Sequence, residues 1–398
     1  MLKKKTTYNK ISVTLLMVAI LFCCGCSDDT SQDIQTSDHQ VHFMLGSQQL
    51  KDVESSLSTR SLPSGYEDYQ TLHPNAIDAQ SNMVVFFTPS TENPARQDVA
   101  TRRLYFNNYQ WSTNVTILDE SHPYYIYGFM PISADDTSSD VDISLLRGET
   151  NYSKGACLTI NDMNAVTLSD VCVISGVKQA TDNISFENVN IVPGAFSYQF
   201  STAYNDYVCL LLDHICAGID LQMKVDETYA TLRSIKLKSL KIWALSDNNE
   251  KIETMTGTVN ITANTQGVSP IIGTNAVTFT SKSNGNEKPI TLYDNSELTS
   301  TDDDQLPKLT TMYQNLQGYY APPSVNRFLM KSIYNIYDRK GNLIREDCAA
   351  ENIFTIQGTN GILQPGKKYT VQITVTPTYL YVLSEPDLDN PTFTVTNQ

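Results

Sequence analysis

Apolar residues recur at every second position in several stretches of this chain. Residues 219–225 (IDLQMKV) and 369–375 (YTVQITV) follow this spacing throughout. Successive side chains of a β-strand point to opposite faces, so a period of two is typical of half-buried strands. In residues 234–245 the apolar phase slips from odd to even positions, which predicts a β-bulge. No window of a dozen residues carries the 3.6-residue period of an amphipathic helix, so the sequence predicts an all-β fold.

The part of the chain after Arg60 is long enough for two domains, since it holds about 340 residues. A polar, turn-rich segment ends near residue 206, and a new apolar run, YVCLLL, begins at residue 207. We therefore expect a boundary near residue 200. The prediction is two β-sandwich domains in tandem, at residues 61–200 and 201–378.

The first 26 residues have the order of an export signal. Four lysines precede a mostly apolar run over residues 11–25, which is shorter than the roughly 20 apolar residues that span a bilayer. Cys26 follows, and the arrangement resembles a bacterial lipobox, although Cys23 stands where leucine is usual. We expect residues 1–25 to be removed as a signal peptide and Cys26 to carry the lipid anchor. An ordinary signal peptide is the alternative.

The formal charge of the exported chain argues against one class of partner. Removing residues 1–25 takes away four of the 28 basic residues and none of the 43 acidic ones, which leaves a formal charge of −19. A field of this sign repels phosphate backbones, so no nucleic acid partner is expected.

The cysteines and histidines do not form a recognisable metal motif. The five cysteines beyond Cys26 are Cys157, Cys172, Cys209, Cys216 and Cys348. An odd number cannot all pair internally, and there is no C-x-x-C pair among them. The five histidines form neither H-x-x-x-H nor H-E-x-x-H, and His214, inside the apolar stretch LLLDHIC, is expected to be a satisfied core or inter-domain histidine. We expect no cofactor and no metal.

The sequence also lacks the signatures of common enzymes. It contains no G-x-S-x-G, no phosphate-binding glycine loop and no dinucleotide fingerprint, so we expect a protein that is not an enzyme. A hydrolase with unrecognised carboxylate pairs stays open, because that test needs distances in space. Tyrosines cluster at residues 124–127 and 379–381 and are the sole support for a surface glycan-binding lipoprotein. Tyrosine is, however, favoured in strands generally.

A single strand precedes the body of the protein. Val41, Phe43 and Leu45 alternate within residues 41–45, and the polar tether ESSLSTR (54–60) follows them. Proteases need an exposed, flexible segment, and this tether is one. We therefore interpret residues 26–60 as a pro-segment that is removed by cleavage between Arg60 and Ser61. The rival sites Arg96, Arg102 and Arg103 are discounted because cleavage there would cut into strands of the first domain.

The tail has a matching feature. Pro377 interrupts a regular strand, since proline has no N–H to donate. Two strand-capable pieces lie beyond it, within residues 379–398. Their candidate donor side chains are Tyr379, Tyr381, Leu383, Phe393 and Val395. These pieces are either strands that can be donated to another subunit or ordinary edge strands of their own domain.

Together, the two ends predict polymerisation by strand donation. Loss of Val41 to Leu45 would leave a groove in the first domain, which the tail of another subunit could fill. Main-chain hydrogen bonds would provide affinity, and alternate side chains would set the register. Head-to-tail donation that does not close produces a filament.

The chain resembles the Bacteroidetes-type fimbrillins, the lipoprotein pilins of type V pili. The resemblance rests on the lipobox at Cys26, SLSTRS around Arg60, the strand YIYGFMP ending at Pro131, LDHICAGID (212–220) and LQPGKKYTVQITVTP (363–377). It implies two transthyretin-like domains and a lipid-anchored precursor in the outer membrane. It also implies an arginine-specific protease acting at Arg60, with other fimbrial subunits as partners in a cell-surface adhesive fibre.

Three ranks of subunit are possible in such a fibre. Arg60 argues against an anchor subunit, which would keep its strand. The spare tail after Pro377 favours a stalk subunit over a tip adhesin, because a tip would have no free donor. Stalk subunit is the main prediction, and tip adhesin is the alternative.

Overall fold

The computed structural model describes much of the chain from residue 39 onward. The described residues are 39–48, 51–52, 69–71, 82–89, 100–107, 110–115, 122–132, 141–146, 155–168, 170–180, 194–200, 207–262, 277–282, 289–295, 297–298, 305–377 and 386–396. The predicted sites Cys26, Arg60, Ser61, Tyr379, Tyr381 and Leu383 lie outside them. No helix in the described part is long and apolar enough to cross a membrane.

Strands form nearly all the regular structure of the described residues, so the prediction of an all-β fold is confirmed. The helix α2 (Glu227–Ala230) is a single turn, and Asp226 caps it by accepting hydrogen bonds from the backbone N–H groups of Thr228 and Tyr229. The finer assignment to two tandem transthyretin-like domains stays a prediction.

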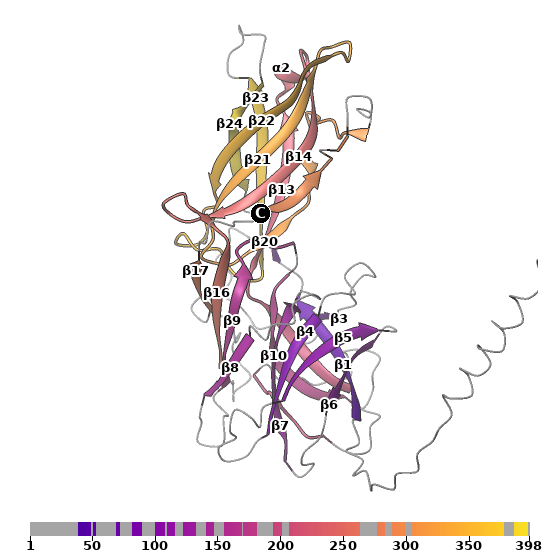
Figure 1. Cartoon of the computed structure of the whole chain (residues 1–398), viewed down its shortest axis with the longest axis vertical. Coiled ribbons are helices and arrows are strands. Elements are labelled where there is room, and N and C mark those ends of the chain that lie inside the picture. Colours follow the sequence, from indigo (N-terminus) through magenta and orange to yellow (C-terminus); the bar gives the residue numbers. More distant parts are fainter. Residues whose placement is uncertain are drawn as a thin grey trace, which may run out of the picture. The chain divides into compact units, whose positions relative to one another are not determined.

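The first sheet contains nine strands within the described residues. They are β1 (His39–Gln48), β3 (Tyr69–Thr71), β4 (Asn82–Pro89), β5 (Ala100–Asn107), β6 (Gln110–Val115), β7 (Tyr124–Ile132), β10 (Cys172–Ala180), β11 (Ser197–Tyr198) and β12 (Tyr207–His214) (Figure 1). Their order is β10-β12-β1-β6-β5-β4-β7-β11, and β3 also pairs with β1. An additional pairing of β10 with β7, at Cys172↔Met130 and Val173↔Phe129, closes this order into a ring.

Apart from β2, the strands of the second and third sheets lie within residues 217–396. The second contains β2 (Lys51–Asp52), β13 (Ala217–Val225), β19 (Gln314–Asn315), β20 (Tyr319–Ala321), β23 (Lys367–Pro377) and β24 (Pro386–Thr396). The third contains β14 (Ser234–Leu245), β15 (Lys251–Ile252), β18 (Ile290–Asp294), β21 (Arg327–Tyr337) and β22 (Leu343–Thr355). The predicted bulge within residues 234–245 is confirmed, since the β14–β21 register shifts between Leu237 and Ser239.

Two hydrophobic cores hold these sheets. The first core gathers buried side chains of β1, β4 to β7, β9, β10, β12 and β16, whereas the second core lies between the second and third sheets. Every apolar residue of the alternating stretches 219–225 and 369–375 is buried in the second core, at 1% exposure or less. The two patterns that predicted half-buried strands are therefore confirmed.

The fourth sheet contributes to both cores. It consists of β8 (Val141–Leu146), β9 (Gly155–Asn164), β16 (Thr254–Thr262) and β17 (Val277–Lys282), in the order β17-β16-β9-β8. On β16, Met255 lies in the second core, whereas Val259 and Ile261 lie in the first. Along the chain, Cys216 is still a member of the first core and Ala217 belongs to the second. The first core therefore includes residues on the C-terminal side of the predicted boundary near residue 200.

Candidate functional site

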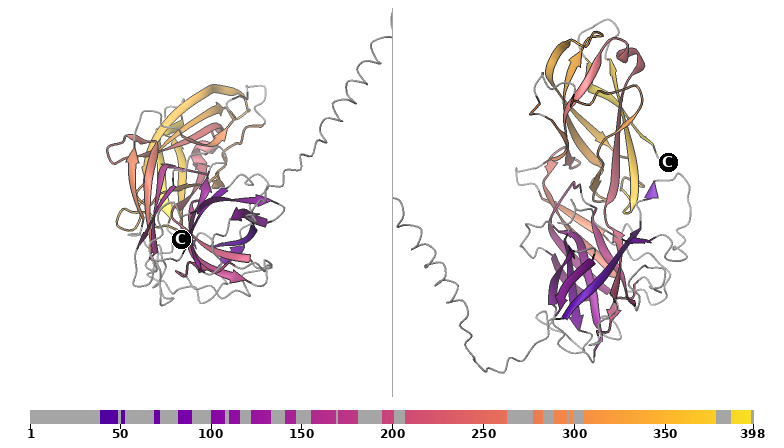
Figure 2. Two further views of the ribbon diagram at one scale, coloured as in Figure 1. Left: turned by 60° about the horizontal axis from the view of Figure 1, so that its bottom comes forward. Right: turned by 90° about the vertical axis from the view of Figure 1, so that its right-hand side faces the viewer.

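The N-terminal strand β1 is an internal strand of the first sheet. It runs parallel to β12, with Phe43 opposite Val208 and Leu45 opposite Leu210. On its other edge it runs antiparallel to β6, with Phe43 opposite Trp111, and its last residues pair with β3. In Figure 2, β1 is the long indigo strand within the first sheet.

In the middle of β1, at residues 43–45, side chains are buried on both faces of the sheet. Phe43 and Leu45 are 2% and 0% exposed and lie in the first core, where the Phe43 ring packs 6.2 Å from that of Phe87. Met44 points to the opposite face and is also buried, at 5% exposure, beside its register partner Cys209. The spacing of Val41, Phe43 and Leu45 predicted a half-buried strand, but Met44 makes the strand apolar on both faces. The side chain of Val41 lies outside the described set.

Apart from β3, whose one strand partner among the described residues is β1, the first sheet stays connected without β1. In the order of the ring, β1 links β12 to β6, but β12 also pairs with β10, and β10 pairs with β7. A path from β12 through β10, β7, β4 and β5 to β6 therefore persists without β1. Removing β1 would open a groove between β12 and β6 and leave unpaired backbone N–H and C=O groups along both walls.

The C-terminal strand β24 is held on one edge alone. It pairs antiparallel with β23, with Val395 opposite Val371 and Phe393 opposite Ile373, and it has no second strand partner among the described residues. Of the predicted donor residues, Phe393 and Val395 thus lie on an edge strand of the second sheet. Within a single chain, residues 386–396 therefore form an ordinary edge strand of their own sheet, which was one of the two alternatives for the tail.

The strands β2 and β24 share one edge of β23. Lys368 pairs with Gly218 of β13 on one side and with Asp52 of β2 on the other. Two residues further along β23, Thr370 pairs with Thr396 of β24 on the same side as β2. The right-hand view of Figure 2 shows β2 as a short indigo arrow beside the yellow strands. The predicted pro-segment and the tail therefore meet at one sheet edge.

Two of the rival cleavage sites lie within a paired strand. Arg102 and Arg103 are in β5, opposite Val85 and Val84 of β4. A protease would have to unpair this strand to reach either bond. Their placement in a strand of the first domain is as expected, whereas Arg96 lies outside the described residues.

A polar cluster lies where β10 begins and β12 ends. His214 is 9% exposed, and its Nδ1 atom lies 2.5 Å from Asp170 Oδ2 and 3.5 Å from Cys172 Sγ. The expectation of a satisfied, buried histidine is confirmed. Burial and the nearby Asp170 carboxylate raise the pKa of the Cys172 thiol well above its ordinary value. Asp170 and Cys172 both approach the same imidazole nitrogen, so the group lacks the relay geometry of a nucleophilic triad, which uses both ring nitrogens.

No disulfide joins the cysteines that the structure describes. All five cysteines beyond the predicted signal peptide and lipid site are free, and Cys172, Cys209 and Cys216 are buried. Burial raises the pKa of the Cys209 thiol to about 12. The Cys209 and Cys216 thiols are therefore protonated at neutral pH and act as small apolar groups, as predicted.

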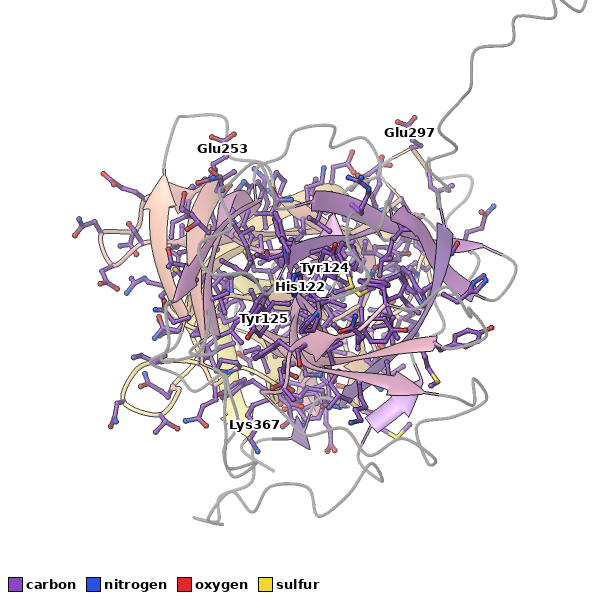
Figure 3. The ribbon with its side chains drawn as sticks, turned by 90° about the horizontal axis from the view of Figure 1, so that it is seen from below. His122, Tyr124, Tyr125, Glu253, Glu297 and Lys367 are labelled. Carbon is purple, nitrogen blue, oxygen red and sulfur yellow. The ribbon has the colours of Figure 1, made fainter. Side chains whose placement is uncertain are left out.

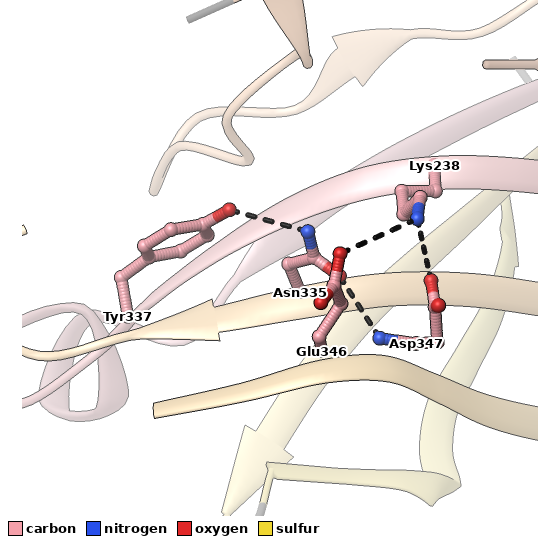
Figure 4. Close-up of polar contacts among 5 residues, drawn as sticks. All are labelled: Lys238, Asn335, Tyr337, Glu346 and Asp347. Carbon is pink, nitrogen blue, oxygen red and sulfur yellow. Dashed lines mark hydrogen bonds and ion pairs between the residues drawn. The ribbon is translucent and has the colours of Figure 1, made fainter. Parts of the chain in front are cut away.

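A second polar cluster surrounds a buried lysine of β14 (Figure 4). Lys238 is 4% exposed, and its Nζ atom lies 2.6 Å from Asp347 Oδ1 and 3.9 Å from Glu346 Oε1. Asn335 accepts a hydrogen bond from the backbone N–H of Asp347, which has a left-handed φ of 53°. The Asp347 and Glu346 side chains are 61% and 41% exposed, so water solvates both carboxylates. The cluster therefore provides ion-pair partners for the buried Lys238 amine, at the point where the register between β21 and β22 shifts.

The tyrosine-rich strand β7 is mainly a core element. Tyr124 and Tyr127 are 5% and 0% exposed, and Tyr125 is partly buried against the first core. Figure 3 shows Tyr124 and Tyr125 beside His122 at the start of this strand. Residues 124–127 therefore present no row of exposed rings, which removes one of the two tyrosine clusters that supported glycan binding. The other cluster, at 379–381, lies outside the described residues.

No protein-family model and no curated protein sequence matches this chain. Solved structures do show likenesses. A candidate cell adhesion protein from Bacteroides fragilis matches with 10% identity and a TM-score of 0.36, over 90% of this chain and 97% of that one. Another from Bacteroides uniformis matches with 10% identity and a TM-score of 0.35, over 91% and 98%. A fimbrial protein from Bacteroides ovatus matches with 9% identity and a TM-score of 0.31, over 88% of this chain and 54% of that one.

Proposed function

We propose that this chain is a structural subunit of a cell-surface fimbrium that polymerises by strand exchange. The observation that carries the proposal is the position of β1, an internal and deeply buried strand in a ring whose other strands, apart from β3, stay connected without it. A strand in this position can be replaced by another extended segment while the rest of the sheet persists. Loss of β1 without replacement would expose apolar side chains and unpaired backbone groups.

The tail is the proposed replacement strand. Because β23 is the one strand partner of β24 among the described residues, release of β24 breaks one ladder of backbone hydrogen bonds and leaves β23 paired with β13. Insertion into the groove between β12 and β6 of another subunit would offer the tail a partner on each edge. The exchange therefore gains one ladder, and this gain favours the polymer. A chain that both donates a tail and accepts one suits a stalk subunit.

Cleavage after Arg60 is the proposed trigger. The segment before this bond contains both β1 and β2, so its departure opens the groove and also clears the sheet edge beside β24. Anchoring through Cys26 would hold the uncut precursor at the outer membrane until the protease acts. No catalytic role is proposed for this chain.

Limited digestion of the exported chain, residues 26–398, with an arginine-specific protease tests this function. We expect a single cut at Arg60, followed by fibres in electron micrographs and ladders in SDS gels without heating. Arg60→Ala should remain monomeric under the same protease, whereas Arg103→Ala, which leaves the tether intact, should assemble as the wild type does. Efficient fibre formation by Arg60→Ala would refute the cleavage step.

Deleting residues 379–398 separates donation from cleavage. The truncated protein should be cut at Arg60 but should not form fibres. Added to intact cleaved subunits, it can accept a tail but cannot donate one, so it should shorten the fibres in proportion to its concentration. Fibres of normal length at an equimolar ratio would show that the tail is not the donor.

A further inference from the structure

Three side chains of metal-binding type lie close together near residues 216–217, where the chain leaves the first core and enters the second. Cys172 and His214 are register partners across β10 and β12, so their side chains leave the same face of the sheet. Asp170 precedes Cys172 by two residues. The donor atoms of the three side chains all lie within 4.8 Å of one another, and they form the one such group of His, Cys, Asp and Glu among the residues that the structure describes.

Two of the three distances between the donor atoms match those between the ligands of a tetrahedral metal site. With a Zn–S bond of about 2.3 Å and Zn–N and Zn–O bonds of about 2.1 Å, a tetrahedron places sulfur about 3.6 Å from the nitrogen and oxygen ligands. Cys172 Sγ lies 3.5 Å from His214 Nδ1 and 3.6 Å from Asp170 Oδ2. The third distance, 2.5 Å between Nδ1 and Oδ2, is that of a hydrogen bond. Replacing its proton by an ion requires this pair to open by about 1 Å.

The surroundings of Asp170 allow this movement. Its side chain is 26% exposed, whereas that of His214 is 7% exposed, so the carboxylate is the ligand with room to turn and the side from which an ion can enter. Its second oxygen, Oδ1, is buried and has no hydrogen-bond partner. A buried acceptor without a partner is costly, and a cation satisfies it.

We propose that Asp170, Cys172 and His214 bind a zinc ion, with the fourth coordination position open to water. A set of one thiolate, one imidazole and one carboxylate suits zinc, whereas magnesium and calcium take oxygen ligands. The site neither depends on strand exchange nor contributes to it in the proposed mechanism.

The expected effect of the ion is to strengthen the connection between the start of β10 and the end of β12, close to where the chain leaves the first core. The backbone N–H of Ile215 donates to Val171, and that of Gly366 donates to Cys216, so the segments around residues 171, 215 and 366 already meet here. An ion bound to Asp170, Cys172 and His214 would add a second tie between the first two of these segments. Because it binds the folded state alone, zinc at a hundredfold excess over its Kd should raise the Tm by about 5 °C.

Cobalt titration of tag-free protein, residues 26–398 carrying Cys26→Ser, tests the site in the presence of a non-chelating reductant. Co²⁺ bound to a thiolate in a tetrahedral site gives a near-ultraviolet charge-transfer band and intense visible bands. We expect both at one equivalent of Co²⁺, with their loss on addition of Zn²⁺. Cys172→Ser should abolish the charge-transfer band, and Asp170→Asn should weaken Co²⁺ affinity at least tenfold.

The control is Cys209→Ala, which removes a buried thiol of the same strand as His214 from the opposite face of the sheet. It should keep the full cobalt spectrum. Circular dichroism of each metal-free variant verifies folding, and Asp170→Asn provides a second, partly exposed position should Cys172→Ser fail to fold. Absence of the band in the wild-type protein, or its persistence in Cys172→Ser, would overturn the proposal and leave a hydrogen-bonded cluster.

Discussion

The first and last strands among the described residues, β1 and β24, are similar in length, at 10 and 11 residues, but the fold holds them differently. β1 has strand partners on both edges and buried side chains on both faces. Among the described residues β24 has a strand partner on one edge, β23, and the buried side chains of β23 lie in the second core. An internal strand is difficult to release unless the chain is cut, whereas an edge strand can be released by local unpairing. The difference explains why the proposed mechanism needs a protease at one end alone.

Deleting β1 and β24 in separate variants tests this comparison, and it is the test with the largest expected effect on stability. Deletion of residues 26–60 with no replacement strand takes Phe43 and Leu45 out of the first core, and each contributes about 1.5–3 kcal/mol by apolar burial. We expect aggregation, or a loss of more than about 5 kcal/mol, when the unpaired backbone of β12 and β6 is included. Deletion of residues 379–398 should leave a folded monomer with a smaller loss. Urea unfolding followed by circular dichroism measures both, and global unfolding of the tail deletion would break the comparison.

A single cavity in β1 sharpens the same point. Leu45→Ala removes a fully buried side chain from the first core and should lower the free energy of unfolding by about 2–5 kcal/mol. His42→Gln, on the same strand but half-buried, should cost less than about 1 kcal/mol. Equal and small effects of the two substitutions in urea melts would mean that β1 is weakly held even before cleavage.

The strands that must stay paired after β1 is removed run from β12 through β10, β7, β4 and β5 to β6. This path can be weakened at Gly128 of β7. A Cβ atom there would lie 2.5 Å from the Val84 carbonyl oxygen of β4 and 2.9 Å from Ile174 Cδ1 of β10. Gly128→Ala should therefore cost about 1–3 kcal/mol. Gly341→Ala is the control, because its Cβ would meet no atom within 4 Å, although its φ of +85° adds strain of about 1 kcal/mol. After cleavage at Arg60, Gly128→Ala should aggregate faster than Gly341→Ala, and light scattering measures this.

Local pattern was sufficient to predict the all-β class, the strands at 219–225 and 369–375, and the bulge in β14. In each case the information lies in the alternation of neighbouring residues, which reports on one face of one strand. Pattern also located the strand around Phe43, although Met44 was not recognised as buried. Its burial depends on what covers the opposite face, which alternation within the strand does not report.

Register between distant strands was the part that the sequence did not reveal. Nothing local indicates that Cys172 lies opposite His214, so His214 was interpreted alone and the Asp170 cluster was missed. The division of β16 between the two cores was also missed. Met255 and Val259 lie on one strand but in different cores, and the register of β16 with β9 shifts between Met255 and Gly257. Motif searches along the chain detect spacing in sequence, whereas these groups are defined by pairing.

A second edge strand, β22, provides the smallest expected effect and a contrast to β24. Lys331 of β21 donates to Glu351 of β22 at 2.9 Å, and this hydrogen bond together with the charge of Lys331 lowers the pKa of the Glu351 carboxyl. The folded-state pKa is below the unfolded value, so the pair stabilises the fold above about pH 4.5, and this contribution is lost as the pH falls through the lowered pKa. Because both side chains are more than 40% exposed, Lys331→Met should cost less than about 1 kcal/mol at pH 7 and a smaller amount near pH 3. Urea melts at the two pH values measure this, and an equal loss at both would mean that Lys331 acts through packing and not through its charge.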